Sequence, residues 1–454
     1  MKYDRNMMFT RDELINATGA VVLRDSLDND ASMFNISTDT RTIKAEDIYL
    51  PLKGESFDGE RFIVKAIEAG AKAYFTANDT LIEGADLVLK VDNTLAAYLN
   101  IAKYYRTKIN PITVAITGSS GKTTTKEIVY SVLSQKFKTQ KTFSNHNNEI
   151  GFCQTVLGMN ESTQALIVEM GMRGLGEIEL ISTHLEPDYA IITNSGSAHV
   201  GRLGSLDNIA IAKCEIAKGL KQTGTFIAKD QDIIKKHLNF NGEKIYYSIE
   251  DVDVIDKKQA YTKFQYKGNT YELNVEGDYN IENSLAAIEL GFKTGLTVEE
   301  IKQGLLSYHP IEKRWELEEI NGLKFINDSY NANPESMKAS VKTFIDLYEK
   351  PVVVLGDMGE LGDNERLYHQ QVGEYLGQLN KNVKYLTVGN LAKEIGKALE
   401  SQGLNVNYFE SNEDVSRYIL DNLNDSYTIF LKASRAMKFE EILEYVKRGI
   451  CKLW

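Results

Sequence analysis

Residues 112–124 read ITVAITGSSGKTT, and they mark the strand, turn and helix around which the chain is organised. The apolar run Ile112–Ile116 predicts a buried strand, and Thr125–Leu133 has the apolar spacing of a helix. The glycine-rich turn between them gathers backbone N–H groups and a helix N-terminus around one small concavity, which suits an anion. Lys122 adds a charge for the outer phosphates of a nucleotide, and Thr123 offers a hydroxyl to Mg²⁺. The stretch therefore predicts a site for a nucleoside triphosphate.

This loop is a variant of the usual phosphate-binding loop. The usual pattern has a glycine five positions before the Gly-Lys pair, whereas Ile116 holds that place and the first glycine of the turn is Gly118. A plain glycine turn with a solvated lysine is the alternative interpretation. The order strand, turn, helix favours the phosphate site, because a phosphate-binding loop connects a strand to the N-terminus of a helix.

The bulk composition excludes several classes of protein. The 454 residues exceed what one core supports, so we expect about two to four domains. A formal net charge of −12 argues against binding to nucleic acid or to an anionic membrane surface. No apolar run reaches the roughly 18 residues of a membrane span, and no apolar segment of a signal peptide follows Met1–Arg5. The three cysteines, Cys153, Cys214 and Cys451, are spaced for neither a disulfide framework nor a zinc cluster, which predicts a reduced, cytoplasmic protein.

The pattern of apolar runs predicts an α/β protein with three domains. Residues 1–92 read as a small α/β domain, with strands near 47–52, 73–76 and 87–91 and a helix near 62–69. Residues 93–312 predict a parallel sheet of the P-loop type, because Ile112–Ile116, Ala165–Val168 and Tyr189–Thr193 are continuous apolar runs separated by helices. Residues 313–454 predict a compact Rossmann-like domain, with strands at 325–326, 352–355, 385–388 and 428–431.

The later part of the central block changes character. Its strands are short and alternate between apolar and polar residues, which favours antiparallel pairing; they are expected at Thr225–Ala228, Lys244–Tyr247, Tyr261–Tyr266 and Tyr271–Val275. The central sheet is therefore predicted to carry an antiparallel extension, followed by a helix near 281–291.

Polar groups follow two strands of the predicted central sheet. Glu169 stands where an apolar strand stops, and His199 lies in the loop after the strand at 189–193. Ligands of open parallel sheets bind beyond the carboxyl ends of the strands, so both side chains are candidate ligands of a Mg²⁺ near Thr123. A histidine at a helix end or in the core is the alternative for His199.

Lys213 lies on an apolar stripe. The segment 205–220 reads as a helix with Ser205 as its N-cap, and Ile209, Lys213, Ile216 and Leu220 share one face. A buried ammonium must reach solvent along its stem, find a partner or lose its charge. Carbamylation is one way to lose it, because a carbamate supplies an anionic oxygen to a hard cation such as Mg²⁺.

Three further loops are rich in polar residues: Asn145–Gly151 before an apolar helix, and Asp328–Pro334 and Gly356–Gly362 after two strands of the last domain. The side-chain amides of Asn145–Gly151 offer donors and acceptors of fixed geometry, which could position a peptide or a phosphate. A capped turn is the alternative for this loop. The two loops of the last domain predict a second binding surface.

These motifs, taken in order along nearly the whole chain, resemble the Mur ligase family. The resemblance rests on Ser37–Arg41, Thr117–Thr124, Asn145–Gly151, Glu169–Gly171, His199, Lys213–Ile216, Asn280–Asn283, Lys313–Arg314, Asp328–Pro334, Gly356–Gly362 and Lys432–Arg435. Within the family, the three polar loops favour the member that adds a dipeptide over relatives that add a single amino acid.

The resemblance also implies roles for individual residues. It places ATP contacts at Gly118, Ser119, Ser120, Gly121, Lys122, Thr123, Thr124, Asn280, Asn283, Arg314 and Asp328. It places contacts to a UDP-sugar substrate at Thr38, Asp39, Thr40, Arg41, Asn145, Asn147 and Asn148, and contacts to the amine substrate at Tyr330, Asn331, Asn333, Ser434 and Arg435. Metal ligands are expected at Thr123, Glu169, His199 and a carbamylated Lys213, and catalytic roles at Lys122, His199 and Lys213.

The activity that the resemblance implies is an ATP- and Mg²⁺-dependent ligation of D-alanyl-D-alanine to UDP-N-acetylmuramoyl-tripeptide through an acyl phosphate. The three domains would bind the UDP-sugar, ATP and the amine substrate in that order. We expect a monomer that acts on small molecules, without a nucleic acid or membrane partner. A ligase that adds one amino acid, a folylpolyglutamate synthase and a P-loop switch protein are the alternatives.

Overall fold

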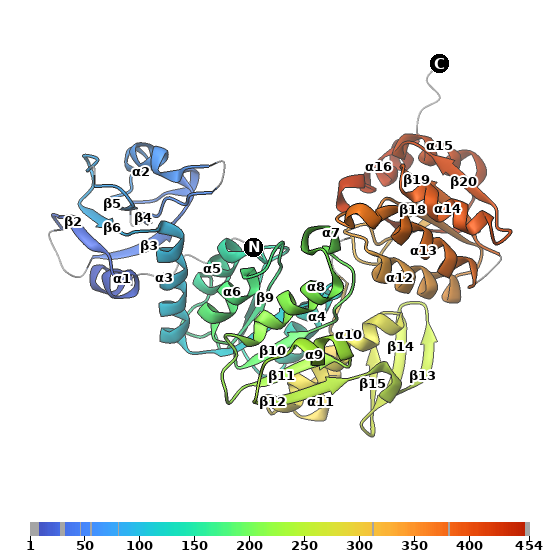
Figure 1. Cartoon of the computed structure of the whole chain (residues 1–454), viewed down its shortest axis with the longest axis horizontal. Helices are drawn as coiled ribbons and strands as arrows, with labels where there is room; N and C mark the ends of the chain where they lie inside the picture. The colour runs from blue at the N-terminus through green and yellow to red at the C-terminus, as the bar shows by residue number, and fades with distance from the viewer. Residues whose placement is uncertain are drawn as a thin grey trace, which may run out of the picture. The chain divides into compact units, whose positions relative to one another are not determined.

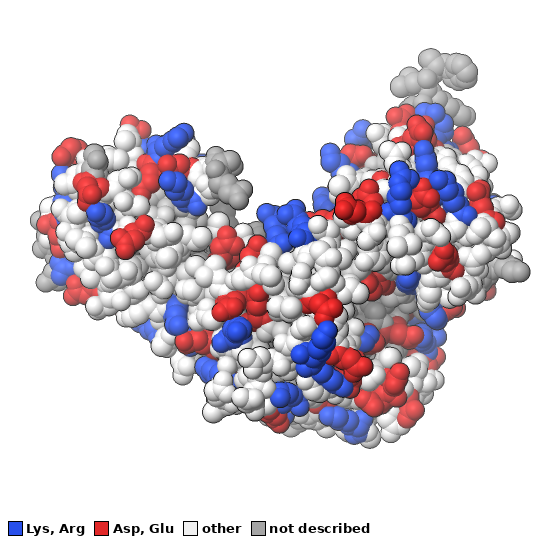
Figure 2. Space-filling view, in the orientation of Figure 1, with Lys and Arg blue, Asp and Glu red and all other residues white. Residues whose placement is uncertain are grey.

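The computed structural model describes residues 9–27, 32–45, 47–54, 57–79, 81–310, 313–379 and 382–449. They form α/β layers with four sheets (Figure 1). Cys451 lies outside the described residues, whereas Cys153 and Cys214 are buried free thiols. None of the described helices is long and apolar enough to cross a membrane. On the face drawn in Figure 2, acidic and basic side chains are interspersed.

The N-terminal sheet has the strand order β1-β3-β4-β5-β6-β2. Its strands are β1 (Phe9–Thr10), β2 (Val21–Asp25), β3 (Met33–Ser37), β4 (Asp47–Tyr49), β5 (Ala73–Thr76) and β6 (Leu87–Lys90), and its helices are α1 (Arg11–Thr18) and α2 (Ile63–Glu68). The pairs from β3 to β6 are parallel, and the two outer strands pair antiparallel. The predicted strands and helix of this domain are therefore confirmed.

The central sheet has the order β12-β11-β10-β7-β9-β8. Its strands are β7 (Ile112–Thr117), β8 (Thr139–Lys141), β9 (Ala165–Glu169), β10 (Tyr189–Ile192), β11 (Thr225–Lys229) and β12 (Glu243–Tyr247). Its helices include α3 (Thr94–Ile109), α4 (Lys122–Leu133), α5 (Glu149–Leu157), α6 (Glu177–Leu185), α8 (Leu206–Cys214) and α10 (Asp278–Lys293). The same part of the chain also contains α7 (Val200–Leu203), α9 (Asp232–His237) and α11 (Val298–Leu306).

The prediction of antiparallel strands at 225–228 and 244–247 is wrong. The strand β11 pairs in parallel with β10 and with β12, so both strands belong to the central sheet. The strand β12 lies at the edge of the sheet and exposes its first residues, and β11 is buried between β10 and β12; neither burial pattern fixes the direction of the strand. The antiparallel extension is confined to β13 (Val252–Lys258), β14 (Tyr261–Tyr266) and β15 (Asn269–Leu273).

The C-terminal sheet has the order β16-β17-β21-β18-β19-β20. Its strands are β16 (Glu316–Ile320), β17 (Leu323–Asn327), β18 (Pro351–Gly356), β19 (Lys384–Val388), β20 (Val406–Phe409) and β21 (Thr428–Lys432). All neighbours pair in parallel except β16 with β17. The four predicted strands are present, and β16 and β20 are additions that the sequence pattern did not reveal.

Helices cover both faces of this last sheet (Figure 1). On one face, Val353 packs with residues of α12 (Pro334–Leu347), α13 (Glu365–Gly377) and α14 (Ala392–Glu400). On the other face, Val352 and Val354 pack with residues of α15 (Asn412–Asn422) and α16 (Glu440–Arg448). Successive residues of a strand point to opposite faces, so β18 buries alternate valines in two separate cores. This arrangement confirms the Rossmann-like domain.

Candidate functional site

The predicted phosphate loop lies between β7 and α4. The helix begins at Lys122, three residues before the predicted start, and Gly121 is its N-cap with a φ of 76°. The prediction began later because the first turn is made of polar threonines, which carry no apolar periodicity. Because α4 begins at Lys122, its N-terminus lies at the loop, and the N–H groups of its first turn favour an anion there.

Two glycines of this loop approach their neighbours too closely for any side chain. A Cβ on Gly118 would lie 1.8 Å from Thr193 Oγ1, and one on Gly121 would lie 2.5 Å from Asn283 Oδ1. Both residues also have positive φ. The glycines of the variant pattern are therefore required by their close approach to Thr193, which follows β10, and to Asn283 of α10.

Asn194, which follows β10, holds the phosphate loop. Its backbone oxygen accepts from the amide of Ser119 at 3.0 Å, and its side-chain oxygen accepts from the amide of Ser120 at 3.0 Å. Its side-chain nitrogen donates to the Ser120 oxygen at 3.1 Å, and Thr193 Oγ1 donates to the same oxygen at 2.6 Å. The loop is thus set in one shape before any ligand arrives.

Lys122 and Thr123 make contacts that lead to other predicted site residues. Lys122 Nζ donates to the Gly118 oxygen at 2.7 Å. Arg314 donates from Nη2 to Thr123 Oγ1 at 3.1 Å, and its guanidinium lies 4.0 Å from the centre of the Tyr330 ring. Thr123 and Arg314, which are predicted to contact ATP, therefore lie beside Tyr330, which is predicted to contact the amine substrate.

Lys213 is buried in α8, with 1% of its surface exposed. Ser205 is the N-cap, as predicted, but the α-helix ends at Cys214 and continues as a short 3₁₀ turn over Glu215–Ala217. Burial lowers the pKa of the Lys213 amine well below its ordinary value, and the positive charge of Lys122 lowers it further. Within the described ranges no carboxylate forms an ion pair with this amine. The surroundings of Lys213 therefore favour its neutral form.

Glu169 and His199, which are also predicted metal ligands, each have a polar partner. Glu169 is the last residue of β9, is 2% exposed and accepts from Asn147 Nδ2 at 3.0 Å. His199 lies 2.6 Å from Glu360 Oε2 through its Nδ1, and this contact holds the pKa of the Glu360 carboxyl below its usual value. No cluster of three or more His, Cys, Asp or Glu side chains suited to a metal ion occurs in the part of the chain that the structure describes.

Asn280 and Asn283 lie in the first half of α10, and both are buried. Asn283 accepts from Thr125 Oγ1 at 3.2 Å, whereas Asn280 donates to the Glu276 oxygen at 2.7 Å. The asparagine at 283 is therefore joined directly to the first turns of α4.

Several residues that are predicted to contact the UDP-sugar interact with neighbours in their own segment. Asp39 caps the 3₁₀ turn Thr40–Thr42 and forms an ion pair with Arg41, whose side chain is 82% exposed. Asn148 is the N-cap of α5 and accepts from the amide of Gly151 at 2.9 Å. Asn145 accepts from Ser144 Oγ at 3.4 Å.

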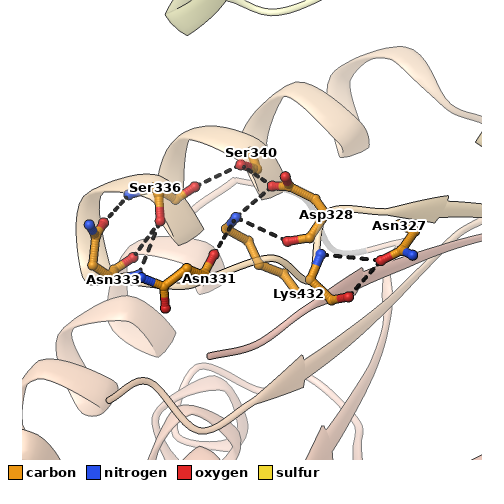
Figure 3. Close-up of polar contacts among 8 residues, drawn as sticks. Asn327, Asp328, Asn331, Asn333, Ser336, Ser340 and Lys432 are labelled. Atoms are coloured by element: carbon orange, nitrogen blue, oxygen red, sulfur yellow. Dashed lines mark hydrogen bonds and ion pairs between the residues drawn. The ribbon is translucent and has the colours of Figure 1, made fainter. Parts of the chain in front are cut away.

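The polar loop 328–333 of the last domain is tightly bonded (Figure 3). Asp328 forms an ion pair with Lys432 at 2.5 Å. Asn333 is the N-cap of α12 and also donates to the Ser119 oxygen at 3.5 Å. Of the residues that follow β21, Ser434 is buried and donates its amide to the Asp357 oxygen, and Arg435 donates to Glu440 at 2.6 Å.

Three polar residues around these loops were not among the predicted site residues. Asn194 lies two residues beyond the end of β10, so the rule that sites lie beyond strand ends could have found it. Glu335, near the start of α12, accepts from the amide and the hydroxyl of Ser197, each at 3.0 Å. An acidic residue in a first helical turn is ordinary, so no local signal distinguishes Glu335. Lys432 belongs to a quoted motif, but its partner is distant in sequence.

Comparison with known proteins agrees with this arrangement. Three family profiles match in order: "Mur ligase family, catalytic domain" at residues 33–111, "Mur ligase middle domain" at 116–291 and "Mur ligase, glutamate ligase domain" at 313–435. A curated protein of Bacillus subtilis named UDP-N-acetylmuramoyl-tripeptide–D-alanyl-D-alanine ligase is 36% identical over 90% of this chain and 92% of its own length. The chain belongs to the Mur ligase family.

Two further relatives support this membership. The Escherichia coli protein with the same curated name is 30% identical over 93% of this chain and 96% of its own. A crystal structure of MurF from Acinetobacter baumannii is 26% identical, with a TM-score of 0.88 over 98% of this chain and all of that one. The three-domain α/β fold of this Mur ligase family member is therefore shared across its whole length.

Proposed function

We propose that the chain is an ATP-dependent ligase that joins D-alanyl-D-alanine to UDP-N-acetylmuramoyl-tripeptide and releases ADP and phosphate. The observation that carries the proposal is the 36% identity, over 90% of the chain, to a protein named for this reaction. The phosphate loop supports it, because an amide ligase of this kind needs a nucleotide site. The reaction belongs to the making of peptidoglycan precursors, and we propose a cytoplasmic, monomeric enzyme.

We propose that each domain binds one substrate. Residues 1–92 bind the UDP-sugar, residues 93–312 bind ATP and residues 313–454 receive the amine. The contacts between Arg314, Thr123 and Tyr330 favour adjacent sites for ATP and the amine, since they join the phosphate loop to the loop that follows β17.

The chemistry explains why ATP is needed. A peptide carboxylate does not acylate an amine at neutral pH, because its leaving group is poor. Transfer of the terminal phosphoryl group of ATP converts the carboxylate to an acyl phosphate, and attack by the dipeptide amine then forms the amide and expels phosphate. Lys122 stabilises the negative charge that develops on the phosphoryl oxygens. Asn194 and the two loop glycines hold the loop in shape, so little reorganisation is needed at the moment of transfer.

The side chains proposed as ligands suit Mg²⁺ by their chemistry. The hydroxyl of Thr123 and the carboxylate of Glu169 are the hard oxygen ligands that Mg²⁺ prefers, and the ion commonly uses one or two carboxylates together with substrate phosphates and water. When bound, it would neutralise charge on the phosphates. We propose Thr123, Glu169 and His199 as its ligands, with His199 exchanging its contact with Glu360.

We also propose that Lys213 is carbamylated in the active enzyme. Its burial and its proximity to the charge of Lys122 favour a neutral amine, which is the form that reacts with carbon dioxide. The carbamate adds an anionic oxygen in surroundings that already contain the Lys122 ammonium.

The test is turnover with defined substrates. ADP and phosphate release is measured with ATP and UDP-N-acetylmuramoyl-tripeptide, first without and then with D-alanyl-D-alanine; a tripeptide carrying lysine and one carrying diaminopimelate are compared. We expect one amide per ADP, only with the dipeptide. The proposal would be refuted if the enzyme preferred a single amino acid, or if its rate of ATP hydrolysis did not depend on the dipeptide. Release of AMP and pyrophosphate in place of ADP and phosphate would also refute it.

A further inference from the structure

Lys432 is a buried lysine at the carboxyl end of β21, and its side chain is 3% exposed. Its ammonium donates three hydrogen bonds, to Asp328 Oδ2 at 2.5 Å, to the Asp328 backbone oxygen at 3.3 Å and to the Asn331 backbone oxygen at 3.3 Å (Figure 3). An ammonium has three donors, so all of them are used. All three acceptors belong to the single loop that follows β17.

The loop has other anchors, on its own segment and elsewhere in the chain. The amide of Asp328 donates to the Leu431 oxygen at 3.0 Å, that of Tyr330 to the Lys313 oxygen at 3.1 Å, and Asn333 Nδ2 to the Ser119 oxygen at 3.5 Å. At one end, Asn327 Oδ1 accepts from the amide and hydroxyl of Ser329, at 3.2 and 2.6 Å. At the other end, Asn333 and Ser336 cap α12. Lys432 is joined to Asp328 from 104 positions away and to Asn331 from 101 positions away. It therefore ties the middle of the loop to the sheet.

The Asp328 carboxylate is committed to this arrangement. Besides the ion pair, its Oδ2 accepts from Ser340 Oγ of α12 at 2.9 Å, and its side chain is 15% exposed. Removing one member of a buried pair leaves the other charge without compensation, which disrupts the surroundings more than the loss of an exposed pair does. Asp328 thus serves as the acceptor that keeps Lys432 in place.

The loop that Lys432 holds carries residues proposed for the amine substrate. Tyr330, between the two anchored residues, stacks against Arg314, and Asn331 is exposed. We propose that Lys432 is a positioning residue, which holds the loop 328–333 in the shape that presents Tyr330 and Asn331 to the incoming dipeptide. This inference rests on the proposed function.

The experiment compares Lys432→Met with Lys447→Met in the full-length chain. Lys447 forms an exposed ion pair with Glu318 in the same domain, with 56% of the lysine side chain exposed, and is the matched control. Hydrogen exchange of the loop amides is measured first, because it needs no substrate. We expect exchange in the segment 328–333 to be about tenfold faster or more in Lys432→Met, and unchanged in Lys447→Met.

Steady-state kinetics then distinguish an effect on the KM for D-alanyl-D-alanine from an effect on the KM for ATP. In Lys432→Met we expect the KM for D-alanyl-D-alanine to rise about tenfold or more, with the KM for ATP nearly unchanged. If Lys432→Met fails to fold, the double variant Asp328→Asn with Lys432→Met removes both buried charges; the backbone bonds of Lys432 are still lost, so the loop should still exchange faster.

Two results would overturn the inference. One is wild-type exchange of the loop in a folded variant that lacks Lys432. The other is an Asp328→Asn variant that leaves the dipeptide KM unchanged, because Asp328 is the acceptor that keeps Lys432 in place. An inactive wild-type protein would refute the proposed function instead, and the exchange comparison would still test Lys432.

Discussion

Replacement of Lys213 by methionine is expected to raise stability and abolish most activity. Methionine has a similar length and helix propensity, so Lys213→Met mainly removes the amine from α8. The lysine is 1% exposed and has no ion-pair partner among the described residues. Burying a polar group without a compensating partner costs roughly 1–3 kcal/mol in protein mutational data. The free energy of unfolding should therefore rise by about that amount in the variant.

The assay is chemical unfolding followed in parallel with turnover, without nucleotide, Mg²⁺ or added bicarbonate in the unfolding arm. The matched control is Lys126→Met, which removes a fully buried lysine of α4 that lies 3.5 Å from Glu127. Because the ion pair between Lys126 and Glu127 is lost, this variant should be destabilised, opposite in sign to Lys213→Met. Turnover should fall by about 10²–10³ in Lys213→Met, the loss typical of a removed charge-stabilising group.

The pH dependence gives a second readout of the same residue. The folded pKa of Lys213 lies below the ordinary value of 10.5, so the unfolded chain binds a proton that the native chain has released. Wild-type stability should therefore gain from rising pH, up to about 10.5, and Lys213→Met should lack this part of the slope.

The response to added bicarbonate distinguishes a carbamylated Lys213 from an unmodified, buried Lys213. Wild-type activity should increase with added bicarbonate, and the variant should not respond. A Lys213→Met enzyme that turns over at the wild-type rate, or one that is less stable than the wild type, would refute the reasoning.

Three further predictions concern other parts of the site. Gly118→Ala should abolish ADP binding measured by titration, because its Cβ would lie 1.8 Å from Thr193 Oγ1; retained affinity would contradict the close approach. Ser205→Ala should lower the free energy of unfolding by about 1 kcal/mol in urea, since it removes the N-cap of α8, and no change would contradict that role. His369 accepts from the Met358 amide at 2.8 Å, and burial lowers its pKa below 6.5, so the native chain resists protonation that the unfolded chain accepts. Its contribution to stability should be complete above about pH 6.5 and be lost as the pH falls; His369→Gln should flatten that slope, and an unchanged slope would contradict the assignment.

The sequence alone determined the features that depend on local order. The run from Ile112 to Leu133 specified strand, glycine turn and helix, since apolar period and glycine placement act over a few residues. The N-cap at Ser205 and the apolar stripe that contains Lys213 followed from the same kind of local pattern. The family resemblance, carried by many short motifs in order, was also visible in the sequence.

Only the tertiary structure decided the pairings between distant segments. The direction of β11 and β12 depends on which strand each one pairs with, and neither segment contains a local signal for that neighbour. The family resemblance implied that Asp328 contacts ATP, but it did not reveal that the Asp328 carboxylate pairs with Lys432, 104 positions away. Such a partner is chosen by the packing of β17 beside β21, and no signal within either segment encodes which charge will be buried next to it.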